Sequence, residues 1–525
     1  MDVREEAKVG LEKAIRFVEE GIVQILQDEL DEEHGVSVCP GATAMASLSL
    51  LILGKGFERS QRGGVNWLIK AQQNQGWGKI PGGTPDPEVT QIGRVVLQGS
   101  RGSLLSKFTL MEEAKQLAQL VLTLGQDVVP GLEGPSAEEI RLPHILEDSV
   151  LEKLPPYGRP VVVAAALLAA NEGQKGIEAG LKMIQESQMP DGSWAEDIVA
   201  TSLCIMALFR FRGMEMDIHH AGIWLTRKQY ASGGWPAFDQ LKTWAVGWSL
   251  SILDERSSLS EGILNKARVW LAQAGNLDGS FGTTPPSSHP DLDDTAIALS
   301  GLPVGCETSN RTIRLLRRLQ NEDGSWGTFP SFSGQPPNIE SRRPVYISSL
   351  DVTVHVVEAL LRQGLPPAEP SVQKALRWIL LQQKKDGPFQ SVWFENAIYG
   401  SAQVIDLLNN VKFGWSMLRM SGQAYYARQR GVEFLLHQYS SNGDWGDSVA
   451  ETSLAISALK NEGAYLDRNL FDRAIQSILS RQNQTGSFIP IYQGIYAKGW
   501  NYEEPISTAL SAIRALEWYV NQAKR

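Results

Sequence analysis

The chain has 525 residues, of which 42% are hydrophobic and 21% are charged, so it has an ordinary globular composition and room for more than one domain. Its formal net charge of −10 argues against a general nucleic-acid surface, which needs a basic face. The three cysteines, Cys39, Cys204 and Cys306, form no CxxC pair, which fits a reducing compartment and offers no structural zinc site.

The N-terminal stretch, residues 1–20, is charged and helical in pattern, so it does not resemble a signal peptide. The most apolar run, residues 42–53, is too short to span a bilayer. We therefore expect a cytoplasmic protein with at most peripheral membrane contact.

A short phrase recurs along the chain: Gln, three residues, Gly, one residue, then an aromatic residue. The clear copies are QMPDGSW (188–194), QYASGGW (229–235), QNEDGSW (320–326) and QNQTGSF (482–488), and looser copies contain Trp77, Phe281, Phe389 and Trp445. Apolar residues before each turn recur at helical spacing, and another helical pattern follows it. Gly accepts the positive φ of such a helix stop. The repeat predicts an all-α fold of helical hairpins, and a closed ring of such hairpins is an α/α barrel.

Three carboxylates gather in HPDLDDTAIAL (289–299), where Asp291, Asp293 and Asp294 follow a Pro and precede an apolar helical run. They fit the N-terminus of a helix, because an Asp side chain accepts hydrogen bonds from the free backbone amides there. Its negative charge is also stabilised by the positive end of the helix dipole. A magnesium site is a weaker interpretation, since carboxylates one turn apart would share a helix face better. The third interpretation is a Brønsted acid, in which like-charged neighbours keep a proton on the cluster.

A Brønsted acid strong enough to protonate an alkene needs a group that stabilises its conjugate base. DVTVHVVEA (351–359) supplies a candidate, because Asp351 and His355 lie one helical turn apart on one face. A lone His on an apolar helix is more often a core residue. An acid four residues earlier favours a function, because Asp351 is placed to hold the imidazole in its charged form.

The repeated Gln-Gly-aromatic turns together with DLDDTA resemble the class II terpene cyclases of the squalene–hopene cyclase type, over most of the chain. The resemblance implies that Asp293 is the proton donor, supported by Asp291 and Asp294. Because DVTVHVVEA resembles the family's DVTAHVLE, it also implies that His355 is the partner of the acid. It further implies aromatic walls that stabilise carbocations. Local matches assign these walls to Trp244, Phe329, Trp393, Tyr399 and Tyr157, and Trp500 and Tyr502 are added by position only.

The resemblance implies a βγ architecture of two α/α barrels. The catalytic barrel would comprise residues 1–28 and 231–525 and carry the DxDD motif, and residues 29–230 would form an inserted barrel. Hopene cyclases have an apolar, membrane-inserting insertion where this chain has the short polar stretch 171–178. A DKWHxSPYY-like stretch and an acidic magnesium motif, usual in bacterial class II diterpene cyclases, are not evident. Arg159, Arg342 and Arg343 are candidate diphosphate contacts, although surface charges of this kind are more often structural.

We expect a class II terpene cyclase that protonates and cyclises a linear isoprenoid, either a C15–C20 prenyl diphosphate or a prenylated aromatic. A squalene-type triterpene substrate and a non-catalytic helical-barrel scaffold are the alternatives. A protein prenyltransferase subunit would need a zinc set, and the seven His form no ligand pattern with the Cys. Initiation requires no cofactor, and Mg²⁺ would be needed only for a diphosphate substrate. Chain length, ring number and oligomeric state stay open.

Overall fold

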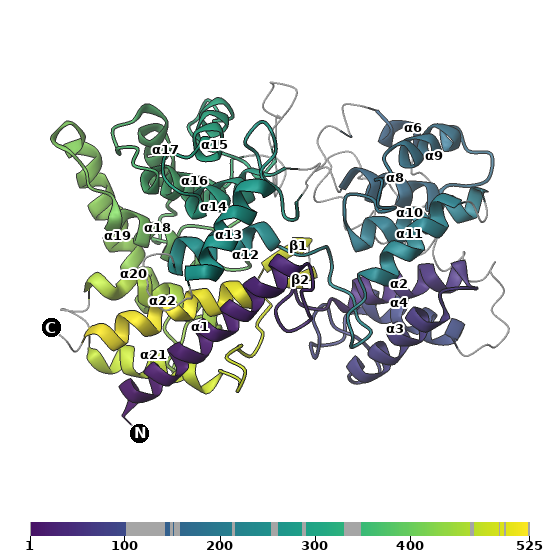
Figure 1. The fold of residues 1–525 in the computed structure, drawn as a ribbon, viewed down its shortest axis with the longest axis horizontal. Coiled ribbons are helices and arrows are strands. Elements are labelled where there is room, and N and C mark those ends of the chain that lie inside the picture. Colours follow the sequence, from purple (N-terminus) through teal and green to yellow (C-terminus); the bar gives the residue numbers. More distant parts are fainter. Residues whose placement is uncertain are drawn as a thin grey trace.

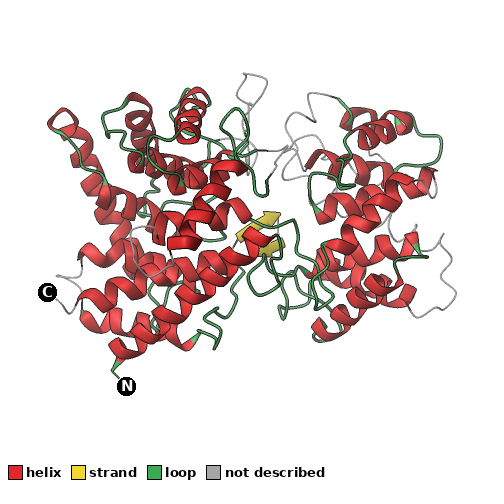
Figure 2. Cartoon of the chain, in the orientation of Figure 1, coloured by secondary structure: helices red, strands yellow, loops and turns green. Residues whose placement is uncertain are grey.

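The computed structural model describes residues 2–100, 142–147, 151, 158–212, 216–253, 261–285, 290–329, 348–462, 467–492, 494–497 and 500–522. In these residues the fold is all-α, as predicted (Figure 2). The two β-strands of the described residues form one small antiparallel hairpin, in which β1 (Gly494–Ala497) pairs with β2 (Trp500–Tyr502).

The helices form two groups that lie side by side, with the hairpin between them (Figure 1). One group consists of α2 (Pro40–Leu53), α3 (Glu58–Ala71), α4 (Pro87–Ser100), α6 (Leu142–Ile145), α8 (Gly158–Ala169), α9 (Ile177–Glu186), α10 (Ile198–Arg212) and α11 (Met216–Arg227). The other consists of α1 (Val3–Gln27), α12 (Lys242–Leu253), α13 (Glu261–Ala274), α14 (Leu292–Gly301), α15 (Glu307–Arg318), α16 (Leu350–Arg362), α17 (Pro370–Leu381), α18 (Ala397–Asn410), η2 (Trp415–Met417), α19 (Leu418–His437), α20 (Val449–Leu459), η3 (Lys460–Glu462), α21 (Arg468–Ser480) and α22 (Pro505–Gln522).

Each group has inner and outer helices, as an α/α barrel requires. The inner helices α2, α10, α16 and α20 are buried around nearly their whole circumference. The outer helices α3, α15, α17 and α21 bury only one face. A helix that is apolar all round must lie inside other elements, whereas an amphipathic helix covers them. The apolar patterns of the sequence therefore determine which helices form the inner ring.

The two groups have separate hydrophobic cores. One core is built from buried residues between positions 39 and 237. The other group holds two clusters, drawn from positions 7–25 and 245–519 and from positions 292–427. Helix α1 joins this second group, where it packs along α22 from the opposite end of the chain (Figure 1).

Hydrogen bonds tie each Gln-Gly-aromatic turn to its surroundings. In the copy at 320–326, the Gln320 amide donates to the Gly324 carbonyl and to the Ser371 carbonyl of the next outer helix, both at 2.8 Å. The Trp326 indole N–H donates to the Leu316 carbonyl at 2.8 Å. Each turn thus satisfies carbonyls at one helix end and fixes the next hairpin beside it.

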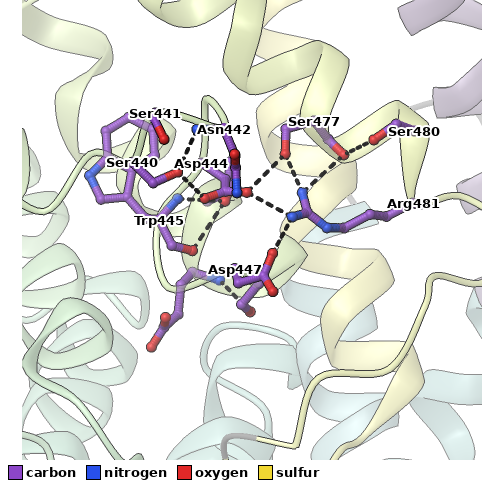
Figure 3. A network of polar contacts seen from close by, with 12 residues as sticks. Ser440, Ser441, Asn442, Asp444, Trp445, Asp447, Ser477, Ser480 and Arg481 are labelled. Carbon is purple, nitrogen blue, oxygen red and sulfur yellow. Dashed lines mark hydrogen bonds and ion pairs between the residues drawn. The ribbon is translucent and has the colours of Figure 1, made fainter.

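The copy around Trp445 adds an ion-pair network (Figure 3). Arg481, which follows α21, donates to the Asp444 carboxylate at 2.7 Å and pairs with Asp447 in the same turn. Ser440 also donates to Asp444, so the buried carboxylate is fully engaged. A buried charge with such partners locks the turn against the neighbouring hairpin.

None of the helices in the described ranges combines the length and the apolar content that crossing a bilayer requires.

We predict that Gly324→Ala destabilises the protein, because Gly324 has φ +98° and an added Cβ would lie 2.8 Å from the Lys374 carbonyl oxygen. Strain of this kind costs about 1–3 kcal/mol, so the midpoint of thermal unfolding, followed by circular dichroism, should fall. The matched control is Gly262→Ala in α13, where an added Cβ meets nothing within 4 Å. Equal midpoints for the two variants would contradict the role of the turn.

Candidate active site

The acid cluster lies at the N-terminus of α14. Asp291 is the N-cap residue, and its side chain accepts a hydrogen bond from the backbone N–H of Asp294 at 2.7 Å. The neighbouring turns hold this segment from both sides, because the Asp291 N–H donates to the Phe281 carbonyl and the Leu292 N–H donates to the Thr328 carbonyl. The helix-cap interpretation of the sequence therefore holds for Asp291, and the same segment carries the three acids of the Brønsted-acid interpretation.

Asp293 contacts a histidine from another helix. Its Oδ1 lies 2.6 Å from Nδ1 of His355 on α16. The Asp293 side chain is 14% exposed, whereas that of His355 is 3% exposed. Asp293 also lies in the first turn of α14, where the helix dipole favours negative charge. The imidazole and the helix end would both stabilise an Asp293 carboxylate.

The other two acids of the cluster are more deeply buried and are coupled to each other. Burial, together with the charges of its neighbours, holds the pKa of Asp294 well above its ordinary value. Burial also raises the pKa of Asp291, and the charge of Asp293 raises it further. Hydrogen bonds from the backbone amides of Asp293 and Asp294 lower this pKa but do not cancel the rise. Two buried carboxyl groups that share a hydrogen bond cannot both ionise cheaply, so this pair retains a proton near neutral pH.

His355 stays charged despite its burial. Burial by itself lowers the pKa of an imidazole, but the charge and hydrogen bond of Asp293, with smaller contributions from Glu358 and Asp351, raise the pKa of His355 to about 9. At neutral pH the group beside Asp293 is therefore an imidazolium.

Asp351 makes different contacts from those that its spacing suggests. Its Oδ2 accepts hydrogen bonds from the Ser391 hydroxyl at 2.8 Å and from the backbone N–H groups of Val392 and Trp393 at 2.8 and 3.0 Å. It acts on His355 only through its charge, as the weakest of the acidic neighbours that raise the imidazole pKa. These hydrogen bonds make Asp351 an anchor for the segment that carries Trp393.

A large cavity lies beside the acid cluster and encloses about 1530 Å³ of empty space, part of it open to solvent. Its walls include Asp291, Asp293 and Asp294. They also include five of the predicted aromatic residues, namely Trp244, Phe329, Trp393, Tyr399 and Tyr502. The structure thus brings the predicted acids and these aromatic rings to one surface.

The aromatic rings are held in place by specific partners. The indole N–H of Trp393 donates to the Thr328 hydroxyl, and that of Trp244 donates to the Ser507 hydroxyl, each at 3.0 Å. Trp244 also meets the His355 ring edge-on, with ring centroids 5.3 Å apart. Fixed rings present their π faces to a cation without rearranging.

Several other predicted residues lie outside this assembly. Tyr157, Arg342 and Arg343 fall outside the described residues. The backbone of Trp500 belongs to β2, and its side chain is likewise not described. Arg159 is exposed at the start of α8 and is not part of the cavity wall.

Three aromatic residues of the wall were not predicted from the sequence, namely Trp248, Phe238 and Phe394. The sequence spacing could have indicated two of them, because Trp248 follows Trp244 by one helical turn and Phe394 follows Trp393 directly. Phe394 stacks on Tyr399, with ring centroids 3.5 Å apart. Phe238 meets the Tyr502 ring edge-on, with ring centroids 5.0 Å apart. This contact joins distant segments, so no local sequence pattern predicts it.

Further carboxyl groups of the wall were also missed. Burial raises the pKa of Glu503 to about 8 and that of Glu504 to about 7. Burial, with the charges of Asp239 and Asp191, raises the pKa of Glu196 to about 7. The Glu504 side chain accepts from the Ser507 N–H at the N-terminus of α22. Within the residues that the structure describes, no group of three or more His, Cys, Asp or Glu side chains is arranged to hold a metal ion.

Comparisons with known proteins find similarity to terpene cyclases. The family model for the squalene-hopene cyclase C-terminal domain matches residues 286–450, which include the acid cluster and His355. A drimenyl diphosphate synthase of Streptomyces showdoensis is 25% identical over 318 residues, which are 57% of this chain and 55% of the relative. A squalene–hopene cyclase of Alicyclobacillus acidocaldarius is 26% identical over 271 residues, or 44% of this chain and 42% of the relative. The chain thus spans only about half the length of these curated relatives.

The fold has a full-length counterpart. The ent-copalyl diphosphate synthase from Streptomyces platensis superposes with a TM-score of 0.56 and 17% identity, and the match covers 99% of both chains. At that identity the likeness concerns the fold alone. The family model and the curated relatives show that the chain is similar to class II terpene cyclases over the parts that they match.

Proposed function

We propose that the protein protonates and cyclises a linear isoprenoid in the cavity beside α14. The observation that supports this most directly is the 2.6 Å contact between Asp293 and the charged His355 at the edge of an aromatic-walled cavity. Asp293 is the proposed proton donor, because it is the most exposed of the three acids and has a cation beside its carboxylate. Asp291 and Asp294 share a proton behind it.

In the proposed reaction, the Asp293 carboxylate first takes up a proton from solvent and then transfers it to a terminal alkene or epoxide of the substrate. The carboxylate left behind is stabilised by the His355 imidazolium and by the N-terminus of α14. The carbocation then passes along the folded chain against aromatic rings, whose π faces stabilise it without reacting. Loss of a proton or capture of water ends the cyclisation.

We further propose that the two helical groups are the catalytic and inserted barrels, with residues 1–28 and 231–525 in the first and 29–230 in the second. The packing of α1 along α22 supports this division. The cavity draws walls from both ranges, for example Glu196 from one and Trp244 from the other.

The proposed substrate is a C15–C20 prenyl diphosphate or a prenylated aromatic. The name of the drimenyl diphosphate synthase relative supports the first of these. A squalene-type triterpene is a second candidate, favoured by the match to the squalene-hopene cyclase family model. Product analysis with farnesyl diphosphate, geranylgeranyl diphosphate, squalene and a geranylgeranylated hydroxybenzoate, each with and without Mg²⁺, separates these candidates. A cyclic product from one of them supports the proposal, and no product from any would contradict it.

We predict that Asp293→Asn lowers the rate of product formation by at least about 100-fold, because an amide cannot replace a positioned general acid. The measurement is product formed per enzyme under single-turnover conditions, with the substrate that the panel identifies. The control is Asp386→Asn, which removes an exposed carboxylate outside the cavity. An Asp293→Asn protein as active as the control would rule out Asp293 as the proton donor.

The proposal also predicts a loss of activity at alkaline pH. The pKa of His355 is raised to about 9, so the imidazolium is present below that pH and disappears as the pH rises through it. The single-turnover rate should fall across the same range. A flat profile between pH 7 and pH 10, recorded where the protein stays folded, would contradict the role of the imidazolium.

For the cavity wall, we predict that Trp393→Leu shifts the products toward partly cyclised compounds, because a cation next to Leu lacks the π stabilisation. Gas chromatography with mass spectrometry gives the product ratio. Trp378→Leu is the control, since Trp378 packs outside the cavity wall. The same product ratio in both variants would show that the Trp393 ring does not act on the cation.

A further inference from the structure

A second, smaller cavity lies against His355, apart from the one that would hold substrate. It encloses about 370 Å³ of empty space and is lined by polar and charged side chains from several helices. Among them are His355 and Glu358 of α16, Gln403 and Asp406 of α18, Ser457 of α20 and Arg514 of α22. Polar cavities of this kind hold water that bonds to the buried groups.

Glu358 is, besides Asp406, an acidic group of this cavity that the proposed reaction does not use. It follows His355 by three residues on α16, so both side chains lie on one helix face, and both line the cavity. Its side chain remains partly accessible, in contrast to that of His355.

The other charges around Glu358 are already paired with one another. Asp406 accepts from Lys460 of η3 at 3.0 Å and forms an ion pair with Arg514 of α22. These two cations and one carboxylate leave one net positive charge, and both cations lower the pKa of Glu358, but His355 is the strongest of the cationic neighbours that act on it.

The charged groups that act on His355 come from two helices. Asp293 of α14 contacts Nδ1, and Glu358 and Asp351 share α16 with the imidazole. The Asp351 carboxylate is committed to the segment 391–393, as its three hydrogen bonds show. The remaining face of His355, toward Trp244, is aromatic. Glu358 is thus the nearest carboxylate in sequence that shares the polar cavity with His355.

We propose that Glu358 is a positioning residue that keeps His355 in its charged form, and that it acts on Asp293 only through His355. This inference rests on the proposed function of Asp293 as the acid. Glu358 belongs to a cavity separate from the substrate cavity, so it need not contact substrate to affect the rate.

The direction of the effect follows from the two titrations. Burial, opposed by the His355 charge, raises the pKa of Glu358 to about 7, so Glu358 is anionic above that pH. His355 titrates at about 9. Between these values a carboxylate faces an imidazolium, and removing the carboxylate lowers the pKa of His355. Below pH 7 Glu358 is neutral, and the loss of its carboxyl group has little effect.

The test is an NMR titration of the full-length protein labelled with ¹³C at histidine Cε1, with the His355 signal assigned by its absence in His355→Asn. In Glu358→Gln the pKa of His355 should fall by about one unit. Ser457→Ala, which alters the same cavity without changing its charge, should leave that pKa unchanged. Glu358→Asp should restore at least part of the shift. An unchanged pKa in Glu358→Gln would overturn the inference.

Two further readouts complete the test. If Glu358→Gln does not fold, the wild-type His355 signal should still show a second, smaller inflection near pH 7, and its absence would overturn the inference. In the activity assay, Glu358→Gln should match the wild type at pH 6 and be about threefold slower at pH 8.5, as a one-unit shift requires. A shifted His355 pKa in a protein without cyclase activity would uphold the tuning role and refute the proposed function.

Discussion

The contact between the Asp293 carboxylate and the His355 imidazole is the interaction on which the remainder of this site depends. It joins residues 62 positions apart on α14 and α16, and it keeps an imidazole charged although the ring is almost completely buried. A buried charge is costly unless it is paired, so the surrounding helices must hold the two groups at bonding distance. The same pairing would stabilise the Asp293 carboxylate left after proton transfer, as the proposed role of Asp293 requires.

The repeated turns supply the rigidity that this pairing needs. Phe281 and Trp326 belong to the two turns that flank the acid cluster, and backbone hydrogen bonds connect those turns to Asp291 and Leu292. Asp351, one turn before His355, anchors the segment that carries Trp393. The acid, its partner and the aromatic wall are therefore linked through the same few backbone segments. A change in one of them is expected to affect the geometry of the others.

Much of the fold could be predicted, because its signals are local. A short window of sequence is enough to predict the helical spacing, the Gly of each turn and the Asp cap of α14. The positions of Asp293 and His355 followed from a resemblance that preserves two such windows. Contacts between distant segments could not be read in this way. Phe238 meets Tyr502 across 264 residues of chain by their numbering, and the partners of Asp351 lie some 40 residues away.

The effect of Glu358 on His355 illustrates the same limit. The spacing placed Asp351 and His355 on one face, as it also does for Glu358, so periodicity alone could not rank the two acids. Only the tertiary structure shows that Asp351 is bound by three donors, whereas Glu358 opens into the polar cavity. Electrostatic roles depend on what else each group contacts, and that is set by packing between helices.

We propose that cyclisation begins with a proton from an acid that exchanges with solvent. It is tested most directly by running the reaction in D₂O with an alkene substrate and locating deuterium in the cyclic product by mass spectrometry and NMR. We expect one deuterium at the ring carbon that was the CH of the terminal alkene. A cyclic product without deuterium at that carbon would contradict it and would show that another event, such as loss of an allylic leaving group, begins the reaction.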